Sequence, residues 1–497
     1  MGRLILLLVL LLPVWAGVTA EIDPAGYTTD TIIAEEFYCM SEEDEDCLMP
    51  GVLTFPKGRF AARPLVLIAH GNGFEFDEYR YLAEHLAHNG FVVAGVASRL
   101  DSEISERVED IFSHLRFLYD THGNQLSDDL VLIGHSRGGE AVIRTANRLN
   151  HQLQGVQLRA LVAMAPSLND GVEALSAHAA QSFLLLYGSH DDDIVGEVEA
   201  GMPCDSPFRL YDRAFEDAGR APQHALGSKA MAFMLGASHG GFSDRESIEP
   251  DPAVGINSYL EPGLQRHTTK RLVLSLLRWQ VFGEAVFAPY LMEAQRSEGV
   301  VLQYEDGARL MLEDFEFATQ EDPVLKPAWR RQGAVTLHWD RLYNLEAHSP
   351  HDSGGLMVKW NESVWSDARL TFELPKEFRD WEGFPYLSFR AAQVYGDINN
   401  RTGCDLDWEI VLESNPLSRA VRVSDFASLH YPETTVSAAI AGMRISKTAM
   451  QTVRIPLSAF GQVDWRGVKA LSFRFTQPRA NGFRRGSLVL DNLALTH

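Results

Sequence analysis

The middle of the chain alternates short apolar runs with amphipathic segments, and this alternation limits the fold more than any other feature. Apolar runs typical of strands buried on both faces occupy residues 65–69, 91–96, 130–133, 158–163 and 183–187. Segments with helical periodicity lie between them at residues 79–88, 104–119 and 140–149. Such alternation predicts an α/β fold in which helices cover both faces of a mostly parallel sheet. A strand at 229–235 and a helix at 265–282 complete this unit.

The apolar pattern changes after about residue 299, where apolar residues recur at every second position. The pattern is clearest at Leu387 and Phe389, at Ile410 and Leu412, and at Leu471 and Phe473. A period of two without long helical segments predicts an all-β sandwich. We therefore expect an N-terminal segment at 21–59, an α/β domain at 60–285, a helical linker at 286–304 and a β-sandwich domain at 305–497.

The N-terminus has the pattern of a secretory signal peptide at residues 1–20. Arg3 precedes an apolar run at 4–12, and the small residues Val18 and Ala20 occupy positions −3 and −1 of a cleavage site. The run is too short for a stable membrane-spanning helix of about 20 residues. We expect cleavage after Ala20 and a secreted or periplasmic protein with no transmembrane segment; an uncleaved anchor is the alternative.

The net charge of the chain limits the kinds of partner that it can bind. With 44 Lys and Arg against 67 Asp and Glu, the formal net charge is −23, which repels phosphate backbones, so we expect no nucleic-acid partner.

Export of the protein would allow its four cysteines to form disulfides. Cys39 and Cys47 flank a short acidic run, and Cys204 and Cys404 could join the two halves, but the sequence leaves the connectivity open.

The sequence Gly134-His135-Ser136-Arg137-Gly138-Gly139 carries the sharpest functional signal. It follows the strand at 130–133 and precedes a helical segment, which is the context required of a G-x-S-x-G nucleophile turn. Glycines on both sides allow a strained turn that lifts the serine above the sheet edge. We predict that Ser136 is a nucleophile.

A serine nucleophile needs a histidine to take its proton and a carboxylate to orient that histidine. His239 lies on a glycine-flanked loop after the strand at 229–235, at the same sheet edge as Ser136, and is the predicted base. Three other histidines fit less well because they lie in the nucleophile turn, before that strand and within the next helix. They are His135, His224 and His267.

The acid should lie in the loop after the strand at 183–187, which contains three consecutive aspartates. Their side chains diverge and cannot all face one imidazole. We predict Asp191 as the acid and keep Asp192 and Asp193 as alternatives. A calcium ligand set made by the same aspartates is a rival interpretation.

Ester or amide hydrolysis also needs two donors directed at the developing oxyanion. We predict the backbone N–H groups of Arg137, next after the nucleophile, and of Asn72, in the glycine-rich loop after the strand at 65–69. His70 is expected to brace that loop without acting in catalysis. Catalysis of this kind needs no cofactor.

With these motifs, residues 60–285 resemble secreted α/β-hydrolases of the type that includes cutinase-like polyester hydrolases, chlorophyllases and platelet-activating-factor acetylhydrolases. The resemblance rests on His70-Gly71-Asn72-Gly73, on the Ser136 turn, on Gly188-Ser189-His190-Asp191 and on Ala237-Ser238-His239. It implies an α/β-hydrolase fold and a Ser-His-Asp triad, but no particular substrate. The three aspartates and Arg137, where polyester hydrolases often have an apolar residue, depart from the pattern.

Residues 305–497 resemble galactose-binding-like jelly-roll modules appended to secreted enzymes. The similar segments begin at Leu312, at Arg454 and at Leu488. This resemblance implies a structural calcium ion, with Glu313, Glu316 and Asp491 as candidate ligands, and binding of a polysaccharide or polymer surface. Tryptophans such as Trp408 could stack on sugars or, as their alternation favours, fill the core.

The sequence therefore predicts a secreted serine hydrolase that cleaves carboxylic esters through an acyl-enzyme. Acyl transfer and amide or thioester hydrolysis would use the same residues. A non-catalytic protein that binds carbohydrate or a surface through its C-terminal sandwich is the alternative from another functional class.

Overall fold

The computed structural model describes most of the chain between residues 23 and 497. The described residues are 23–26, 28, 31–40, 48–58, 61–99, 102–168, 174–191, 193–194, 198–199, 202–203, 206–216, 227–245, 259–293, 299–316, 329–345, 351–361, 368–414, 417–432, 434–436, 444–475 and 485–497. The predicted signal peptide, Cys47, Cys204, Asp192 and His224 lie outside them. Within the described residues, Cys404 forms no disulfide, and no helix is long and apolar enough to cross a membrane.

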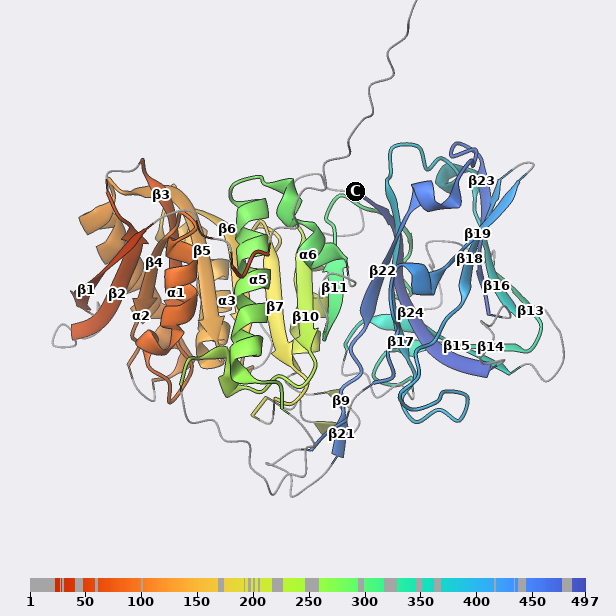
Figure 1. Ribbon diagram of the computed structural model, residues 1–497, viewed down its shortest axis with the longest axis horizontal. Coiled ribbons are helices and arrows are strands. Elements are labelled where there is room, and N and C mark those ends of the chain that lie inside the picture. Colours follow the sequence, from red (N-terminus) through yellow and green to blue (C-terminus); the bar gives the residue numbers. More distant parts are fainter. Residues whose placement is uncertain are drawn as a thin grey trace, which may run out of the picture.

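A nine-stranded sheet forms the N-terminal half, with strand order β1-β2-β4-β3-β5-β6-β7-β10-β11 (Figure 1). The strands from β4 to β10 run parallel, and β1, β2 and β11 pair antiparallel at the two edges. Their bounds are β1 Ile32–Met40, β2 Leu48–Pro56, β3 Arg63–Ala69, β4 Val92–Val96, β5 Leu126–His135, β6 Gln157–Met164, β7 Phe183–Gly188, β10 Lys229–Met234 and β11 Val300–Glu305. The α/β prediction is confirmed.

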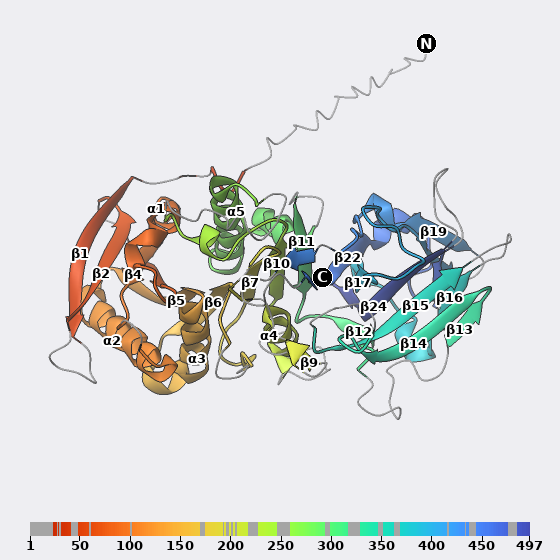
Figure 2. The same cartoon turned by 90° about the horizontal axis from the view of Figure 1, so that it is seen from below.

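Helices cover both faces of this sheet, as Figure 2 shows, with α1 and α5 on one face and α2, α3 and α4 on the other. Their bounds are α1 Arg80–Ala87, α2 Ile104–His122, α3 Arg137–Gln152, α4 Pro207–Arg213, α5 Pro262–Gln280 and the short α6 Pro289–Met292. Successive side chains of a strand point to opposite faces. Leu67 and Leu132 therefore join the core under α2 and α3, and their neighbours Val66 and Val131 join the core under α1 and α5.

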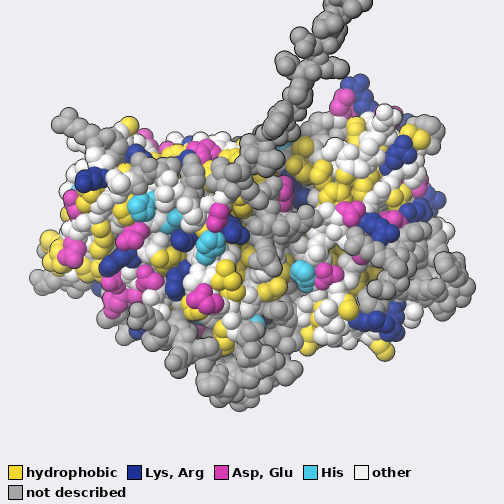
Figure 3. Space-filling model, viewed as in Figure 1, with side chains coloured by type: hydrophobic (Ala, Val, Ile, Leu, Met, Phe, Trp, Pro, Cys, Tyr) yellow, Lys and Arg dark blue, Asp and Glu magenta, His cyan; other side chains and the backbone are white. Residues whose placement is uncertain are grey.

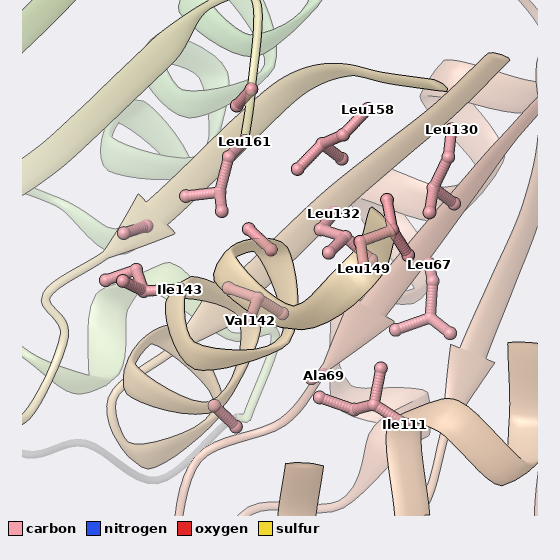
Figure 4. Close-up of a cluster of buried hydrophobic side chains, with 14 of the residues drawn as sticks. Leu67, Ala69, Ile111, Leu130, Leu132, Val142, Ile143, Leu149, Leu158 and Leu161 are labelled. Carbon is pink, nitrogen blue, oxygen red and sulfur yellow. The ribbon is translucent and has the colours of Figure 1, made fainter. Parts of the chain in front are cut away.

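Helix α3, which begins directly after Ser136, packs on the core that lies under α2 and α3. Figure 4 shows Val142, Ile143 and Leu149 directed toward leucines of the strands, among them Leu132 and Leu161. All five side chains are buried. The helix that starts at the predicted nucleophile is thus fixed on the sheet by apolar burial along its length.

The sheet extends past the predicted domain limits at residues 60 and 285. Strands β1 and β2 come from the expected N-terminal segment, and β11 comes from the expected helical linker at 286–304. The linker prediction is thus wrong for residues 300–304, although α6 is helical. A short apolar run does not distinguish strand from helix, and an open sheet edge supplies the backbone partners that select the strand.

The C-terminal half contains two antiparallel sheets that share one apolar core, so the predicted β-sandwich is confirmed. One sheet has the order β14-β15-β24-β17-β22, with β12 also paired to β24, and the other has the order β13-β16-β23-β18-β19. Their bounds are β12 Leu310–Glu313, β13 Trp329–Gln332, β14 Val335–Arg341, β15 Gly354–Asn361, β16 Arg369–Glu373, β17 Tyr386–Gln393, β18 Glu409–Ser414, β19 Ser418–Arg422, β22 Gln451–Pro456, β23 Val468–Arg474 and β24 Arg485–Thr496. The hairpin β20 Thr434–Val436 and β21 Arg444–Ser446 lies outside both sheets.

Tryptophans of the sandwich mostly fill its core. Trp360, Trp381 and Trp408 are buried, whereas Trp339 is 41% exposed. Buried rings cannot stack on a sugar, so Trp408 serves packing. On the face drawn in Figure 3, basic and acidic side chains are interspersed, and the net negative charge is not gathered there into one patch.

A buried arginine joins the two domains. Arg390 of β17 donates from Nη1 to Asp212 Oδ1 of α4 at 2.7 Å and from Nη2 to the carboxylate of Asp491 in β24. His351 Nδ1 lies 2.9 Å from Asp212 Oδ2. Although burial alone would raise the pKa of Asp212, His351 and Arg390 hold it well below its ordinary value. The domains therefore meet through charged groups that are buried and paired.

The nine-stranded sheet and the sandwich sheet that ends in β22 also meet at their edges. Thr452 of β22 accepts a hydrogen bond at Oγ1 from the Tyr304 N–H of β11 at 2.9 Å and donates one to the Tyr304 carbonyl at 3.2 Å. The β11 edge of the nine-stranded sheet is therefore covered by the sandwich.

We expect Arg390→Met to destabilise the protein by about 3–5 kcal/mol, because it leaves Asp212 and Asp491 buried without their shared guanidinium. Urea unfolding followed by tryptophan fluorescence measures this loss. Arg466→Met is the control, because Arg466 pairs with Glu382 on the surface and its loss should leave the unfolding midpoint nearly unchanged. Equal midpoints for Arg390→Met and wild type would contradict the role given to Arg390.

The buried histidine His114 should make the stability of the protein depend on pH. Burial lowers the pKa of His114 on α2 to about 4, and its Nε2 lies 2.9 Å from the Ala97 carbonyl. The unfolded chain, with an ordinary histidine pKa of about 6.5, takes up this proton more readily, so stability is full above pH 6.5 or so and falls as the pH drops toward 4. His114→Gln should reduce that fall by about 2 kcal/mol at pH 5, measured by urea unfolding at pH 7.5 and 5. Equal losses of stability between pH 7.5 and pH 5 in His114→Gln and in wild type would contradict this role of His114.

Candidate functional site

Ser136 stands in a strained turn between β5 and α3. Its backbone angles are φ 53° and ψ −124°, a combination that non-glycine residues rarely adopt. Hydrogen bonds hold the turn on both sides, from Ser136 N–H to the Met164 carbonyl at 3.0 Å and from Ser167 N–H to the Ser136 carbonyl at 3.1 Å. The strain is thus supported by the end of β6, and the sequence-predicted nucleophile turn is present.

The glycines around Ser136 are required by close packing of the backbone. A Cβ at Gly134 would lie 2.2 Å from the Gly138 carbonyl oxygen, and a Cβ at Gly138 would lie 2.4 Å from the Ala69 carbonyl oxygen. Neither glycine has a positive φ. Within residues 134–138 the positive φ therefore falls on Ser136, and the glycines let α3 start close against the ends of β3 and β5.

The loop after β3 lies directly against the nucleophile turn. A Cβ at Gly71 would lie 2.9 Å from Ser136 Cβ. The Gly71 N–H donates to Tyr79 Oη at 3.4 Å, and the Tyr79 hydroxyl is 2.7 Å from His135 Nδ1. This chain of hydrogen bonds connects the loop with the residue before Ser136.

Two buried side chains brace the same loop. Arg107 of α2 donates to the His70 carbonyl at 3.3 Å and to Asn72 Oδ1 at 3.2 Å. His70 accepts the Ser98 N–H at Nε2 and lies 2.7 Å from the Gly71 carbonyl through Nδ1. Burial lowers the pKa of His70 to about 4, so it is neutral near pH 7. His70 thus has the bracing position expected from the sequence.

The two backbone groups predicted to hold the oxyanion belong to Arg137, the residue after Ser136, and to Asn72, in the loop whose Gly71 packs against Ser136. Arg137 is the first residue of α3, and the first N–H groups of a helix have no acceptor within the helix. Asn72 follows Gly71 in the braced loop. The Arg137 N–H thus needs an acceptor outside the helix, as an oxyanion donor does. The role of the Asn72 N–H stays a prediction.

The structure brings His239 and Asp191 together. His239 Nδ1 lies 3.0 Å from Asp191 Oδ2, and both residues are buried. Asp191 Oδ1 accepts the N–H groups of Asp193 and Ile194 at 3.1 and 2.8 Å, which orients the carboxylate. On the other side, Gln265 of α5 bonds both the N–H and the carbonyl of Ser238. Of the described aspartates in this loop, Asp191 is the one that meets Nδ1.

The other ring nitrogen of His239 is the one that would face Ser136. Asp193 Oδ2 lies 3.3 Å from this Nε2, and the Asp193 side chain is 68% exposed. Among the described residues, no hydrogen bond joins Ser136 Oγ to His239. Catalytic hydrogen bonds often form only when substrate is bound.

Two rejected histidines have other surroundings. His135 is fully buried, and its ring centroid lies 4.6 Å from that of His239. Burial, followed by the charge of His239, lowers the pKa of His135 well below the ordinary value, so it is neutral. His267, on α5, lies 3.5 Å from Asp23 Oδ2 at the surface. Neither can replace His239 beside Asp191.

The calcium ligands predicted for the sandwich, Glu313, Glu316 and Asp491, are all described residues. Burial and the nearby Asp491 raise the pKa of Glu316 to about 8, and Asp491 is bonded to Arg390 and Ser353. Glu313 Oε1 accepts the Phe315 N–H. In the described part of the chain, no three His, Cys, Asp or Glu side chains are arranged to hold a metal ion. A calcium ion in the sandwich therefore stays a prediction.

A cavity of about 460 Å³ lies where the two domains meet. It is lined by Phe233 and Val301 from the nine-stranded sheet and by Asp405, Tyr431 and Lys447 from the sandwich, among others. Ser136, His239 and Asp191 do not line it, so we do not assign it to the substrate.

Comparison with known proteins supports a serine hydrolase in this half of the chain. Residues 61–189 match the family described as serine aminopeptidase, S33. The match includes Ser136 and ends before Asp191 and His239. No curated protein matches the chain. Residues 61–189 are therefore similar to serine hydrolases of the α/β-hydrolase family, and a β-rich region follows them.

Sequence reasoning missed the residues that support the site. Arg107 and Tyr79 were part of amphipathic segments, where a charged or hydroxylated residue is ordinarily exposed. Arg107 is buried instead, with its guanidinium under the His70 loop. A charged residue on the apolar side of a helical pattern was the available signal.

We expect Asp191→Asn to lower kcat by about 10³- to 10⁴-fold, because an amide at Nδ1 would favour the wrong tautomer of His239. Asp193→Asn should change kcat by less than about tenfold, since that exposed carboxylate does not orient the ring. Initial rates of ester hydrolysis at pH 7.5 measure both. Equal losses would contradict Asp191 as the orienting acid.

Proposed function

We propose that this protein is a secreted serine esterase that uses Ser136, His239 and Asp191 as a catalytic triad. The observation that carries the proposal is the strained Ser136 turn, packed against the Gly71 loop at the same sheet edge as the bonded pair His239 and Asp191. Strain of this kind is costly and is commonly kept for function. Secretion rests on the signal-peptide pattern at residues 1–20.

In the proposed reaction, Ser136 Oγ attacks the ester carbonyl carbon and gives its proton to His239 Nε2. The N–H groups of Asn72 and Arg137 hold the negative oxygen of the tetrahedral intermediate. The carbon–oxygen bond to the alcohol then breaks, and His239 returns the proton to the leaving oxygen. Water, deprotonated by His239, attacks the acyl-enzyme, and Ser136 regains its proton as the acid is released.

The local electrostatics suit this reaction. Asp191 is buried and its Oδ1 is held by two backbone donors, so the carboxylate stabilises the imidazolium that forms. Neighbouring His135 and His70 stay neutral and do not oppose that charge. No step requires a cofactor.

Amide hydrolysis at an amino terminus is the second candidate function. It is favoured by the description of the matching family, serine aminopeptidase. An aminopeptidase must bind the ammonium group of its substrate, and the exposed carboxylate of Asp193 lies beside His239 Nε2. Thioester hydrolysis and acyl transfer would use the same residues.

The sandwich domain is the basis of a non-catalytic alternative. Binding of a polysaccharide or polymer surface is expected from the resemblance of residues 305–497, and among the tryptophans discussed above Trp339 has an exposed ring for it. In that case the isolated sandwich would bind its target and the full protein would turn over no ester.

We expect Ser136→Ala to abolish labelling by a fluorophosphonate and to lower ester turnover by at least about 10⁴-fold. Peptide mapping identifies the labelled residue, and p-nitrophenyl butyrate and leucine p-nitroanilide distinguish esterase from aminopeptidase. Ser167→Ala is a matched control, because Ser167 is a buried serine next to Ser136. This variant should still be labelled at Ser136. Unchanged turnover in Ser136→Ala would overturn the proposal, and turnover of the anilide alone would favour the second candidate.

A further inference from the structure

The side chain of Lys447, in the β-sandwich, reaches the loop that carries Asp191. Lys447 lies between β21 and β22, on the sandwich side of the domain boundary. Its Nζ donates to the Asp191 carbonyl at 2.8 Å and lies 3.5 Å from the Gly188 carbonyl. The lysine side chain thus holds the main chain of the triad acid from a position 256 residues further along the sequence.

Lys447 is enclosed at this position. The residue is 2% exposed, and its Nζ lies 4.5 Å from the ring centroid of Tyr187, the residue before Gly188. The Tyr187 hydroxyl donates to the Ile194 carbonyl at 2.5 Å. Lys447 therefore contacts the start of the acid loop at its backbone and at the aromatic ring that also bonds the loop's far end.

The segment that carries Lys447 is itself fixed on the first domain. Met450 N–H donates to His351 Nε2 at 3.3 Å, and the other nitrogen of His351 meets Asp212 of α4. Thr452 bonds both backbone groups of Tyr304 in β11. Contacts on both sides of the domain boundary thus limit how far Lys447 can move.

We propose that Lys447 is a positioning residue for catalysis, so that the sandwich completes the active site of the first domain. This inference rests on the proposed function, because it gives Lys447 a role through Asp191. Lys447 touches neither His239 nor the nucleophile in the contacts described above. It acts by holding the Asp191 backbone, and through the carboxylate it keeps His239 Nδ1 at its 3.0 Å separation.

Lys447→Met keeps the length and burial of the side chain and removes its donors. A small displacement of a catalytic group can cost about 10²-fold in rate, so we expect kcat to fall by about 10- to 100-fold while KM stays the same. Lys447→Arg, which keeps charge and donors, should recover kcat to within about fivefold of wild type. Ester hydrolysis and the rate of fluorophosphonate labelling are measured for each variant.

Lys229→Met is the matched control. Lys229 is also buried and donates to three carbonyls, those of Tyr211, Asp212 and Ala214, but these belong to α4 and the residue after it. Its loss should lower stability and leave kcat of the folded protein near wild type. A similar fall in kcat for Lys229→Met would show that Lys447 acts through general stability, and would overturn the proposal.

A double-mutant cycle separates positioning from any independent effect. If Lys447 acts through Asp191, Lys447→Met should lower the labelling rate by no more than about twofold in the Asp191→Asn background. A loss as large as in the wild-type background would refute the inference. If Lys447→Met does not fold, Lys447→Gln, which keeps a shorter donor, takes its place in the same cycle.

The outcomes for Lys447 and for the proposed function are distinguishable. An inactive Ser136→Ala together with a fully active Lys447→Met would reject the positioning role and keep the serine mechanism. A fully active Ser136→Ala would reject the mechanism itself, and the positioning role with it.

Discussion

The buried guanidinium of Arg390 is the interaction on which the arrangement of the two domains depends. It bonds Asp212 from the α/β domain and Asp491 from its own sandwich, and these carboxylates would be costly to bury without it. A buried charge requires its partners at hydrogen-bond distance, so Arg390 holds α4 against the paired strands β17 and β24. The neighbouring contacts of Thr452 and Lys447 depend on that same relative position.

The candidate site combines strain at one residue with support from several elements. The Ser136 turn is held by β6, the facing loop by Arg107, and the His239 loop by Gln265. Each support comes from a helix or strand fixed in an apolar core, and the buried His70 and His135 next to the site are neutral. A rigid surround of this type limits how far the candidate reactive groups can move.

Local patterns in the sequence were sufficient to predict the elements and the motif-bearing residues. Period and length placed β3, β5, β7 and α3, and the turn around Ser136 was visible because glycines mark close backbone packing. Strand β11 was missed, because its selection depends on pairing with β10 across a long gap. Arg107 and Lys447 were missed for a related reason, since no local pattern tells which partner a long polar side chain will meet. The three aspartates could be ranked from the sequence, but the contact of Asp191 with His239 Nδ1 could be identified only in the structure, because it joins two loops far apart in the chain.

The contact between Lys447 and Asp191 also has a consequence for biosynthesis. A ribosome makes the chain from its N-terminus, so the α/β domain can fold while residue 447 has yet to be made. The sandwich closes later still, because β24 at residues 485–496 is an inner strand of its sheet, paired with both β15 and β17. The part of the molecule that contains the proposed nucleophile therefore exists for a time without its partner domain. A hydrolase assembled in this order would acquire its complete site only after nearly all of the chain has been synthesised.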